Sequence, residues 1–279
     1  MADQLMTTTE LAAVIPETWS SKWYDTLLTD PVLVDSVARD YEGEISALGD
    51  TVNVTQFNEV EAVEIAENEA VSAQSSTPTN IQLIVNKMVA YDYIVTTRAD
   101  KQSLNHVNAL RNNVMHAILK KMQAIMLALI VPSASAPDHQ IAYDSGTTLA
   151  LADMLGAKEL LDGANVPDDG SRCMITDAPQ WNDVFNITGF TSRDYIPAGS
   201  PLSSGSLPTP ILGFKAKLST VAANKSYFFH PSFMQLAVQQ QPSVEVFNMG
   251  AEGKRALRVN TTVLFGVKQF SNVRVVQVG

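Results

Sequence analysis

Apolar side chains recur every three or four residues through the middle of the chain. This stretch runs from about Arg98 to Val131, contains no Pro or Gly, and is followed by Pro132. The apolar positions are Leu104, Val107, Leu110, Val114, Ile118, Met122, Ile125 and Leu129. Such spacing predicts a helix with one apolar face. Because an α-helix rises 1.5 Å per residue, a helix over most of the stretch would be about 50 Å long.

Two segments before this helix alternate apolar and polar residues, which is the pattern of half-buried strands. They are Asp50–Thr55 and Asn80–Val85, and both are rich in β-branched residues. The segment between them, Phe57–Pro78, is acidic at first and then rich in Ser and Thr. It has too few large apolar residues for a core of its own. The pattern therefore predicts a long hairpin with a projecting tip.

The first forty residues show no sustained period. Two prolines bracket a candidate helix, Glu17–Leu28, in which Trp19 and Trp23 fall four residues apart on one face. We expect this face to be covered by the chain itself or by a neighbouring subunit. We interpret the region as an extended arm.

About ninety residues after the long helix mix short helices and strands. An Ala- and Leu-rich segment, Thr148–Leu161, predicts a helix that ends near Gly163. Further short elements are predicted as strands at Arg172–Thr176, Ile211–Thr220 and Tyr227–His230, and as helices at Pro179–Phe185 and from Pro231 to about Val238. The order indicates a compact α/β unit.

The last forty residues favour strands. These are Ser243–Phe247, Leu257–Leu264 and Val273–Val278. So short a segment cannot bury three strands alone, and we expect it to return beside the long helix. The result would be an α+β domain built from two separated parts of the chain.

Charge is segregated along the chain. No Lys or Arg stands between Arg39 and Lys87, whereas the acidic residues there include Glu42, Glu44, Asp50, Glu59, Glu61, Glu64, Glu67 and Glu69. The segment after Glu252 has no acidic residue and carries Lys254, Arg255, Arg258, Lys268 and Arg274. Two solvated faces of opposite sign would explain this pattern. Contact between the acidic hairpin of one subunit and the basic segment of the next is the alternative that we hypothesise.

Composition changes the picture in two ways. Only 17% of the 279 residues are charged, against a usual share of about 25%, so little of the chain suits a solitary wet surface. The formal net charge of −10 repels phosphate backbones at long range and disfavours a DNA-binding function. Cys173 is the only cysteine, the N-terminus lacks a secretory pattern, and the apolar run Met122–Val131 is shorter than the roughly 20 residues that span a bilayer.

The sequence contains no recognisable motif of a catalytic, metal or cofactor site. Cys173 lies in an apolar predicted strand, where a buried inert thiol is expected. The four histidines are scattered, and no Cys-x-x-Cys or His-Glu-x-x-His spacing occurs. Gly250–Lys254 lacks the spacing and the hydroxyl of a phosphate loop, and Ser203–Ser206 does not form a nucleophile elbow. We therefore expect no cofactor and no enzyme activity.

The order of parts and several short motifs resemble a known family. The motifs are Val37–Ile45 (VARDYEGEI), Gly49–Val52 (GDTV), Ile211–Phe214 (ILGF), Phe228–Ser232 (FFHPS) and Phe265–Lys268 (FGVK). Together they resemble the tailed-phage major capsid proteins of the Hong Kong 97 type, over nearly the whole chain from about Ile15.

The resemblance implies an α+β capsid fold in four parts. These would be an N-terminal arm (1–40), an extended loop (41–95), a peripheral domain with the long spine helix (96–147 and 240–279) and an α/β axial domain (148–239). It also implies self-assembly as pentamers and hexamers into an icosahedral head that encloses double-stranded DNA, with assembly in the bacterial cytoplasm. A separate scaffolding protein, a portal and a decoration protein are the expected partners. The expected subunit interface comprises Trp19, Trp23, Glu59, Glu61, Glu64, Glu67, Glu69, Lys254, Arg255 and Arg258.

Two other functions remain open at this stage. An encapsulin-like compartment resembles the same fold but encloses cargo enzymes, so the contents of the particle would distinguish it. A cytoplasmic α/β hydrolase or ligand-binding protein would instead be a monomer with a polar cleft.

Overall fold

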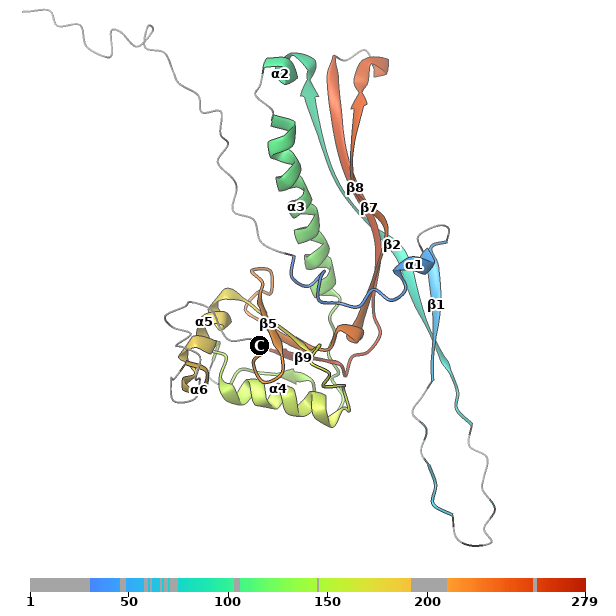
Figure 1. Ribbon diagram of the computed structural model, residues 1–279, viewed down its shortest axis with the longest axis vertical. Helices are drawn as coiled ribbons and strands as arrows, with labels where there is room; N and C mark the ends of the chain where they lie inside the picture. The colour runs from blue at the N-terminus through green and yellow to red at the C-terminus, as the bar shows by residue number, and fades with distance from the viewer. Residues whose placement is uncertain are drawn as a thin grey trace, which may run out of the picture.

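The computed structural model describes most of the chain after the first thirty residues. The described residues are 31–45, 49–57, 75–102, 106–144, 146–191, 210–252 and 255–279, with residues 60, 62–65, 67 and 70 of the loop between positions 57 and 75. They form an elongated molecule in which the large sheet runs along the long axis and the smaller sheet lies to one side of it (Figure 1). The expected helix Glu17–Leu28 lies outside the described residues.

The larger sheet is antiparallel and has four strands in the order β1-β2-β8-β7. Its strands are β1 (Thr51–Gln56), β2 (Thr79–Thr96), β7 (Met234–Asn248) and β8 (Ala256–Gln269). The predicted hairpin is confirmed, because β1 pairs with the first part of β2 from Gln56↔Thr79 to Thr51↔Ile84. However, β2 continues for another twelve residues and pairs with β8. The hairpin is thus an extension of the large sheet, and Figure 1 shows β1 projecting from its side.

The long helical stretch is described as two helices. The short α2 (Thr97–Gln102) follows β2 directly, and α3 (His106–Ala128) spans 23 residues, about 35 Å. Residues 103–105 lie outside the described residues. The first turn of α2 is tied to the sheet, because the Thr97 amide donates a hydrogen bond to the carbonyl of Arg255.

One face of α3 covers the large sheet. Its buried residues are Val114, Ile118, Met122 and Met126, and they share a hydrophobic core with Val263 and Phe265 of β8 and with half-buried Val89 of β2. The same core includes Leu33, Val34 and Val37 from the segment that leads into the described part of the chain. This packing confirms the predicted apolar face at Val114, Ile118 and Met122, whereas Leu129 is 36% exposed and the first three predicted positions lie outside the described side chains.

The smaller sheet has five strands in the order β3-β9-β6-β4-β5. The strands are β3 (Gln140–Ile141), β4 (Cys173–Thr176), β5 (Lys215–Leu218), β6 (Ser226–Phe229) and β9 (Val275–Val278). Helices α4 (Leu151–Gly163), α5 (Ala178–Asn186) and α6 (Thr188–Thr191) lie beside it (Figure 1). Met154, Ala157 and Leu161 of α4 pack with Phe214 and Phe228 in a second core.

The chain passes between the two sheets through short connections that are hydrogen-bonded to other parts of the chain. One runs from α3 to β3, the second is the single turn η1 (Pro231–Phe233) between β6 and β7, and the third joins β8 to β9. The Phe233 carbonyl accepts hydrogen bonds from the amides of Phe270 and Ser271. Ala38 pairs with Gln235 beside this turn, and α1 (Glu42–Ile45) follows. The two sheets are therefore connected to each other by short segments that hydrogen-bond to one another.

Two expectations about the later elements are wrong. The helix expected from Pro231 to about Val238 is one 3₁₀ turn followed by β7, because Leu236 and Ala237 are buried and pair with β8. The final strand was expected beside the long helix, but β9 pairs with β6 and β3 in the smaller sheet. Consequently the boundaries expected at residues 147 and 240 divide this sheet, since β3 and β9 both lie outside 148–239.

Candidate subunit interface

The hairpin loop exposes apolar side chains that no part of the described chain covers. Phe57 and Val60 are each 69% exposed, Val63 is 64% exposed, and Ile65 is 48% exposed. Glu64 and Glu67 lie among them and are also exposed. Large apolar side chains gathered with carboxylates on a projecting loop are typical of a surface that a partner buries.

A second exposed apolar surface lies on the face of the large sheet opposite α3. Ile94, Arg258 and Phe247 stand opposite one another on β2, β8 and β7, so their side chains share that face. Met88 lies on the same face of β2, since it is separated from Ile94 by an even number of residues. Met88 is 65% exposed and Ile94 is 56% exposed. We name this surface, formed by Met88, Ile94, Phe247 and Arg258, the outer sheet face.

The basic residue on the outer sheet face already has a partner in its own chain. Arg258 donates from Nε to Asp92 Oδ2 at 2.7 Å, and its Nη2 lies 2.5 Å from the same oxygen. The hydrogen bond from Arg258 lowers the pKa of Asp92 below its ordinary value of 3.8. Arg258 is therefore engaged within the subunit, which the charge pattern of the sequence did not indicate.

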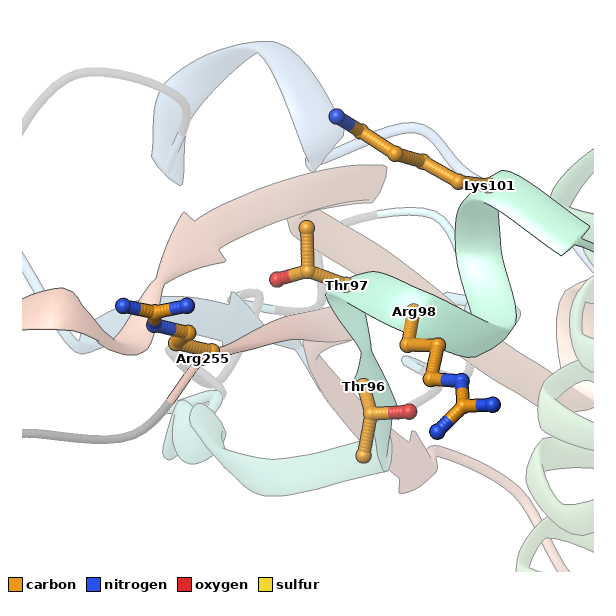
Figure 2. A pocket seen from close by; sticks show the side chains of 5 residues that line it. All are labelled: Thr96, Thr97, Arg98, Lys101 and Arg255. Carbon is orange, nitrogen blue, oxygen red and sulfur yellow. The ribbon is translucent and has the colours of Figure 1, made fainter.

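An open basic pocket of about 380 Å³ lies where β2 ends and β8 begins. It is lined by Thr96, Thr97, Arg98, Lys101 and Arg255, and no carboxylate lines it. Figure 2 shows that these side chains come from the end of β2, from α2 and from the residue before β8, with the guanidinium groups of Arg98 and Arg255 turned to opposite sides. Arg98, Lys101 and Arg255 are all exposed. The lining therefore consists of cations and hydroxyl groups, which are groups that bind carboxylates and other anions.

The expected interface residues fall into four groups. Arg255 lies in the basic pocket, Arg258 pairs with Asp92, and Glu64 and Glu67 are exposed on the loop. Trp19, Trp23, Glu59, Glu61, Glu69 and Lys254 lie outside the described residues. Arg98 and Lys101 were missed, because nothing in the sequence brings α2 next to the residue before β8. The pairing of Thr96 with Ala256 and the hydrogen bond from the Thr97 amide to the Arg255 carbonyl bring them together.

The structure also shows the surroundings of the single cysteine and of the possible metal ligands. Cys173 is a free thiol in β4 with 4% exposure, as predicted, and burial raises its pKa. Among the described residues, no three His, Cys, Asp or Glu side chains are placed to share a metal ion. In the same part of the chain, no helix has the length and apolar character needed to cross a membrane.

The described part of the chain thus combines two sheets with exposed apolar surfaces and a basic pocket. Residues 42–279 match the family model described as phage capsid protein. The chain belongs to this phage capsid protein family. It is a capsid protein of a bacteriophage virion, and the order of its helices and sheets is that of phage capsid structures.

Solved capsid structures have the same fold. A chain of Mycobacterium phage Che8 is 21% identical, with a TM-score of 0.76 over 95% of this chain and 97% of that one. The capsid chain of cyanophage P-SCSP1u is 9% identical, with a TM-score of 0.77 over 100% and 96%. The capsid chain of cyanophage Pam1 is 15% identical, with a TM-score of 0.72 over 100% and 98%. A search of curated protein sequences finds no significant match.

Proposed function

We propose that the chain is the major capsid protein of a tailed phage and assembles as pentamers and hexamers into the icosahedral head around double-stranded DNA. Membership of the phage capsid family carries this proposal. The exposed hairpin and outer sheet face support it, because both need partners to bury their apolar side chains. Closed shells of identical subunits use heterologous contacts of this kind. A scaffolding protein, a portal and a decoration protein are the partners that such a head would use during assembly in the bacterial cytoplasm.

On this proposal, the subunit divides into an arm, an extended loop, a peripheral domain and an axial domain. We assign residues 1–40 to the arm and residues 41–95 to the extended loop. The peripheral domain comprises the large sheet with α3 as its spine, and the axial domain comprises the five-stranded sheet with α4–α6. On this assignment β3 and β9 belong to the axial domain, which revises the limits expected from the sequence.

The acidic hairpin is proposed to reach the basic pocket of the next subunit. The hairpin segment between Arg39 and Lys87 has no cation, and the pocket has no carboxylate. Each exposed ion pair contributes only about 0–1 kcal/mol, but a shell repeats the contact in every copy. Because Arg258 already pairs with Asp92, the receiving cations are Arg98, Lys101 and Arg255.

Charge reversal tests this contact. Changing Glu61, Glu64 and Glu67 to Lys should block particle assembly, because it opposes like charges at the pocket. Adding Arg98→Glu, Lys101→Glu and Arg255→Glu in the same chain should partly restore particles, measured by sedimentation and electron microscopy. Raised salt should also weaken assembly of the unchanged protein, since screening acts over roughly 8 Å at physiological ionic strength.

A matched control separates pairing from net charge. Lys215→Glu, Lys225→Glu and Lys268→Glu change the net charge equally but lie outside the pocket. Rescue by both sets would attribute the effect to overall charge, and rescue by neither would refute the proposed pairing. A chain that stays monomeric under every scaffold, salt and concentration condition would refute the capsid function itself.

A further inference from the structure

The exposed side of α3 differs in charge from the rest of the protein. No Asp or Glu stands between Asp100 and Asp138, although the whole chain has 29 acidic residues and a net charge of −10. Lys120 and Lys121 are both exposed on α3. Within the described residues neither lysine has a carboxylate partner. We name this surface, centred on Lys120 and Lys121, the cationic helix face.

Helix geometry directs this face away from the sheet. Val114, Ile118, Met122 and Met126 repeat every four residues and are buried against the sheet. At about 100° per residue, Lys120 falls on the side of the helix opposite this buried row, whereas Lys121 falls at the edge of the row, about 20° from Val114; both side chains are exposed. The Lys120 amine therefore faces away from the subunit core, and the exposed Lys121 amine lies at the margin of the same solvent-exposed side.

The cationic helix face also lacks the apolar groups of a protein interface. Large exposed apolar residues occur on the hairpin and on the outer sheet face, but none occurs among residues 113–128 of α3, where side chains are described. Ala117 and Ala128 are the other exposed residues of this part of the helix. Interfaces between proteins bury an apolar core and are depleted in Lys. A polyanion fits this surface better than a second copy of the chain.

We infer that the cationic helix face binds the phosphate backbone of duplex DNA inside the shell. The inference rests on the proposed capsid function, and it orients the subunit with α3 toward the interior and the outer sheet face away from it. Duplex DNA carries one negative charge per about 1.7 Å, and Lys contacts phosphate as a sequence-independent point charge. Two cations per subunit, repeated over the shell, offset at close range the repulsion that a net charge of −10 creates at long range.

Lysine labelling of DNA-filled and emptied heads tests the contact. An amine-reactive reagent is applied to both kinds of head, and modification is read by mass spectrometry. Labelling of Lys120 and Lys121 should rise several-fold after the DNA is released, whereas labelling of Lys215 in β5 should be unchanged. Strong labelling in both kinds of head would place α3 on the exterior and overturn the inference. Weak labelling in both would show that a protein chain covers the helix and would also overturn it.

Charge reversal supplies an independent measurement. Lys120→Glu with Lys121→Glu should lower the temperature at which filled heads release DNA, while Lys215→Glu with Lys268→Glu, an equal change in net charge, should not. Equal effects of the two pairs would overturn the inference and leave the capsid function standing. Failure of the unchanged chain to form any DNA-containing head would overturn both.

Discussion

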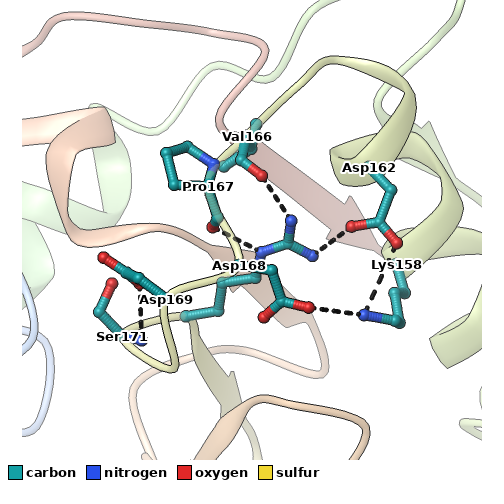
Figure 3. A network of polar contacts seen from close by, with 8 residues as sticks. Lys158, Asp162, Val166, Pro167, Asp168, Asp169 and Ser171 are labelled. Carbon is teal, nitrogen blue, oxygen red and sulfur yellow. Dashed lines mark hydrogen bonds and ion pairs between the residues drawn. The ribbon is translucent and has the colours of Figure 1, made fainter.

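At the scale of the residue, the buried guanidinium group of Arg172 is held from three sides. It donates to Asp162 Oδ1 at 2.6 Å, to the Val166 carbonyl at 2.5 Å and to the Pro167 carbonyl at 3.0 Å. Figure 3 shows this network between the end of α4 and the loop that leads to β4, with Lys158 beside it. The hydrogen bond from Arg172 lowers the pKa of Asp162. Arg172 therefore joins α4 to the smaller sheet.

Replacement of Arg172 should destabilise the subunit. Arg172→Met keeps most of the buried volume but leaves the Val166 and Pro167 carbonyls without these donors, at a cost of about 2–3 kcal/mol. Urea unfolding of the unassembled subunit measures the change. Lys158→Met is the control: it removes contacts to two half-exposed carboxylates and should cost about 0–1 kcal/mol. Equal losses in the two variants would contradict a special role for the buried group.

At the scale of the element, the large sheet depends on a close approach between β2 and β8. The register of the two strands shifts between Val85 and Lys87, opposite Gly266. A Cβ atom added at Gly266 would lie 2.6 Å from the carbonyl oxygen of Ile84 and 3.0 Å from the Val85 Cα. Both are backbone atoms, which cannot rotate away as a side chain can. Glycine here allows one long sheet to include both the hairpin and the helix-covered strands.

Gly266→Ala should therefore weaken the large sheet. The strands must separate locally, and we expect a loss of about 1–3 kcal/mol in the free energy of unfolding. Gly163→Ala at the end of α4 is the matched control, since nothing lies within 4 Å of its added Cβ. Alanine in a helix should leave stability unchanged or raise it by up to about 1 kcal/mol. An unaffected Gly266→Ala protein would show that the bulge relaxes without cost.

At the scale of the whole molecule, the absence of Lys from the hairpin limits which covalent cross-links can join neighbouring subunits. Some capsid proteins of the Hong Kong 97 type form a Lys–Asn isopeptide bond from the extended loop to a neighbouring subunit. That bond needs an amine on the loop that can lose its proton. Here the chain has no Lys from Tyr41 to Asn86, and Lys87 is half-buried on β2, where it pairs with Phe265 of β8.

Mature particles should accordingly contain no such cross-link. Boiling in detergent and reductant should yield a single band near 30.2 kDa, because the hairpin supplies carboxylates but no nucleophile. Stability would then come from apolar burial of the hairpin, from the arm or from a decoration protein. A ladder of covalent multimers, with a Lys–Asn linkage identified by mass spectrometry, would contradict this prediction.

The sequence by itself determined the features that depend on local period and composition. Spacings of three or four predicted the apolar face of α3, and alternation predicted the pairing of β1 with β2. The apolar surroundings of Cys173 predicted its burial. These properties follow from neighbours a few residues apart, so a single sequence carries them.

Only the tertiary structure decided which distant segments pair. The stretch after Pro231 follows β8 rather than its own helical pattern, and β9 joins the smaller sheet because β6 and β3 offer hydrogen-bonding edges there. Likewise, Arg258 pairs with Asp92 while Arg255 joins Arg98 and Lys101 in the basic pocket, although charge counting treats all these cations alike. Hydrogen bonds and ion pairs depend on distances of a few ångströms between residues more than a hundred positions apart, and no local pattern encodes those distances.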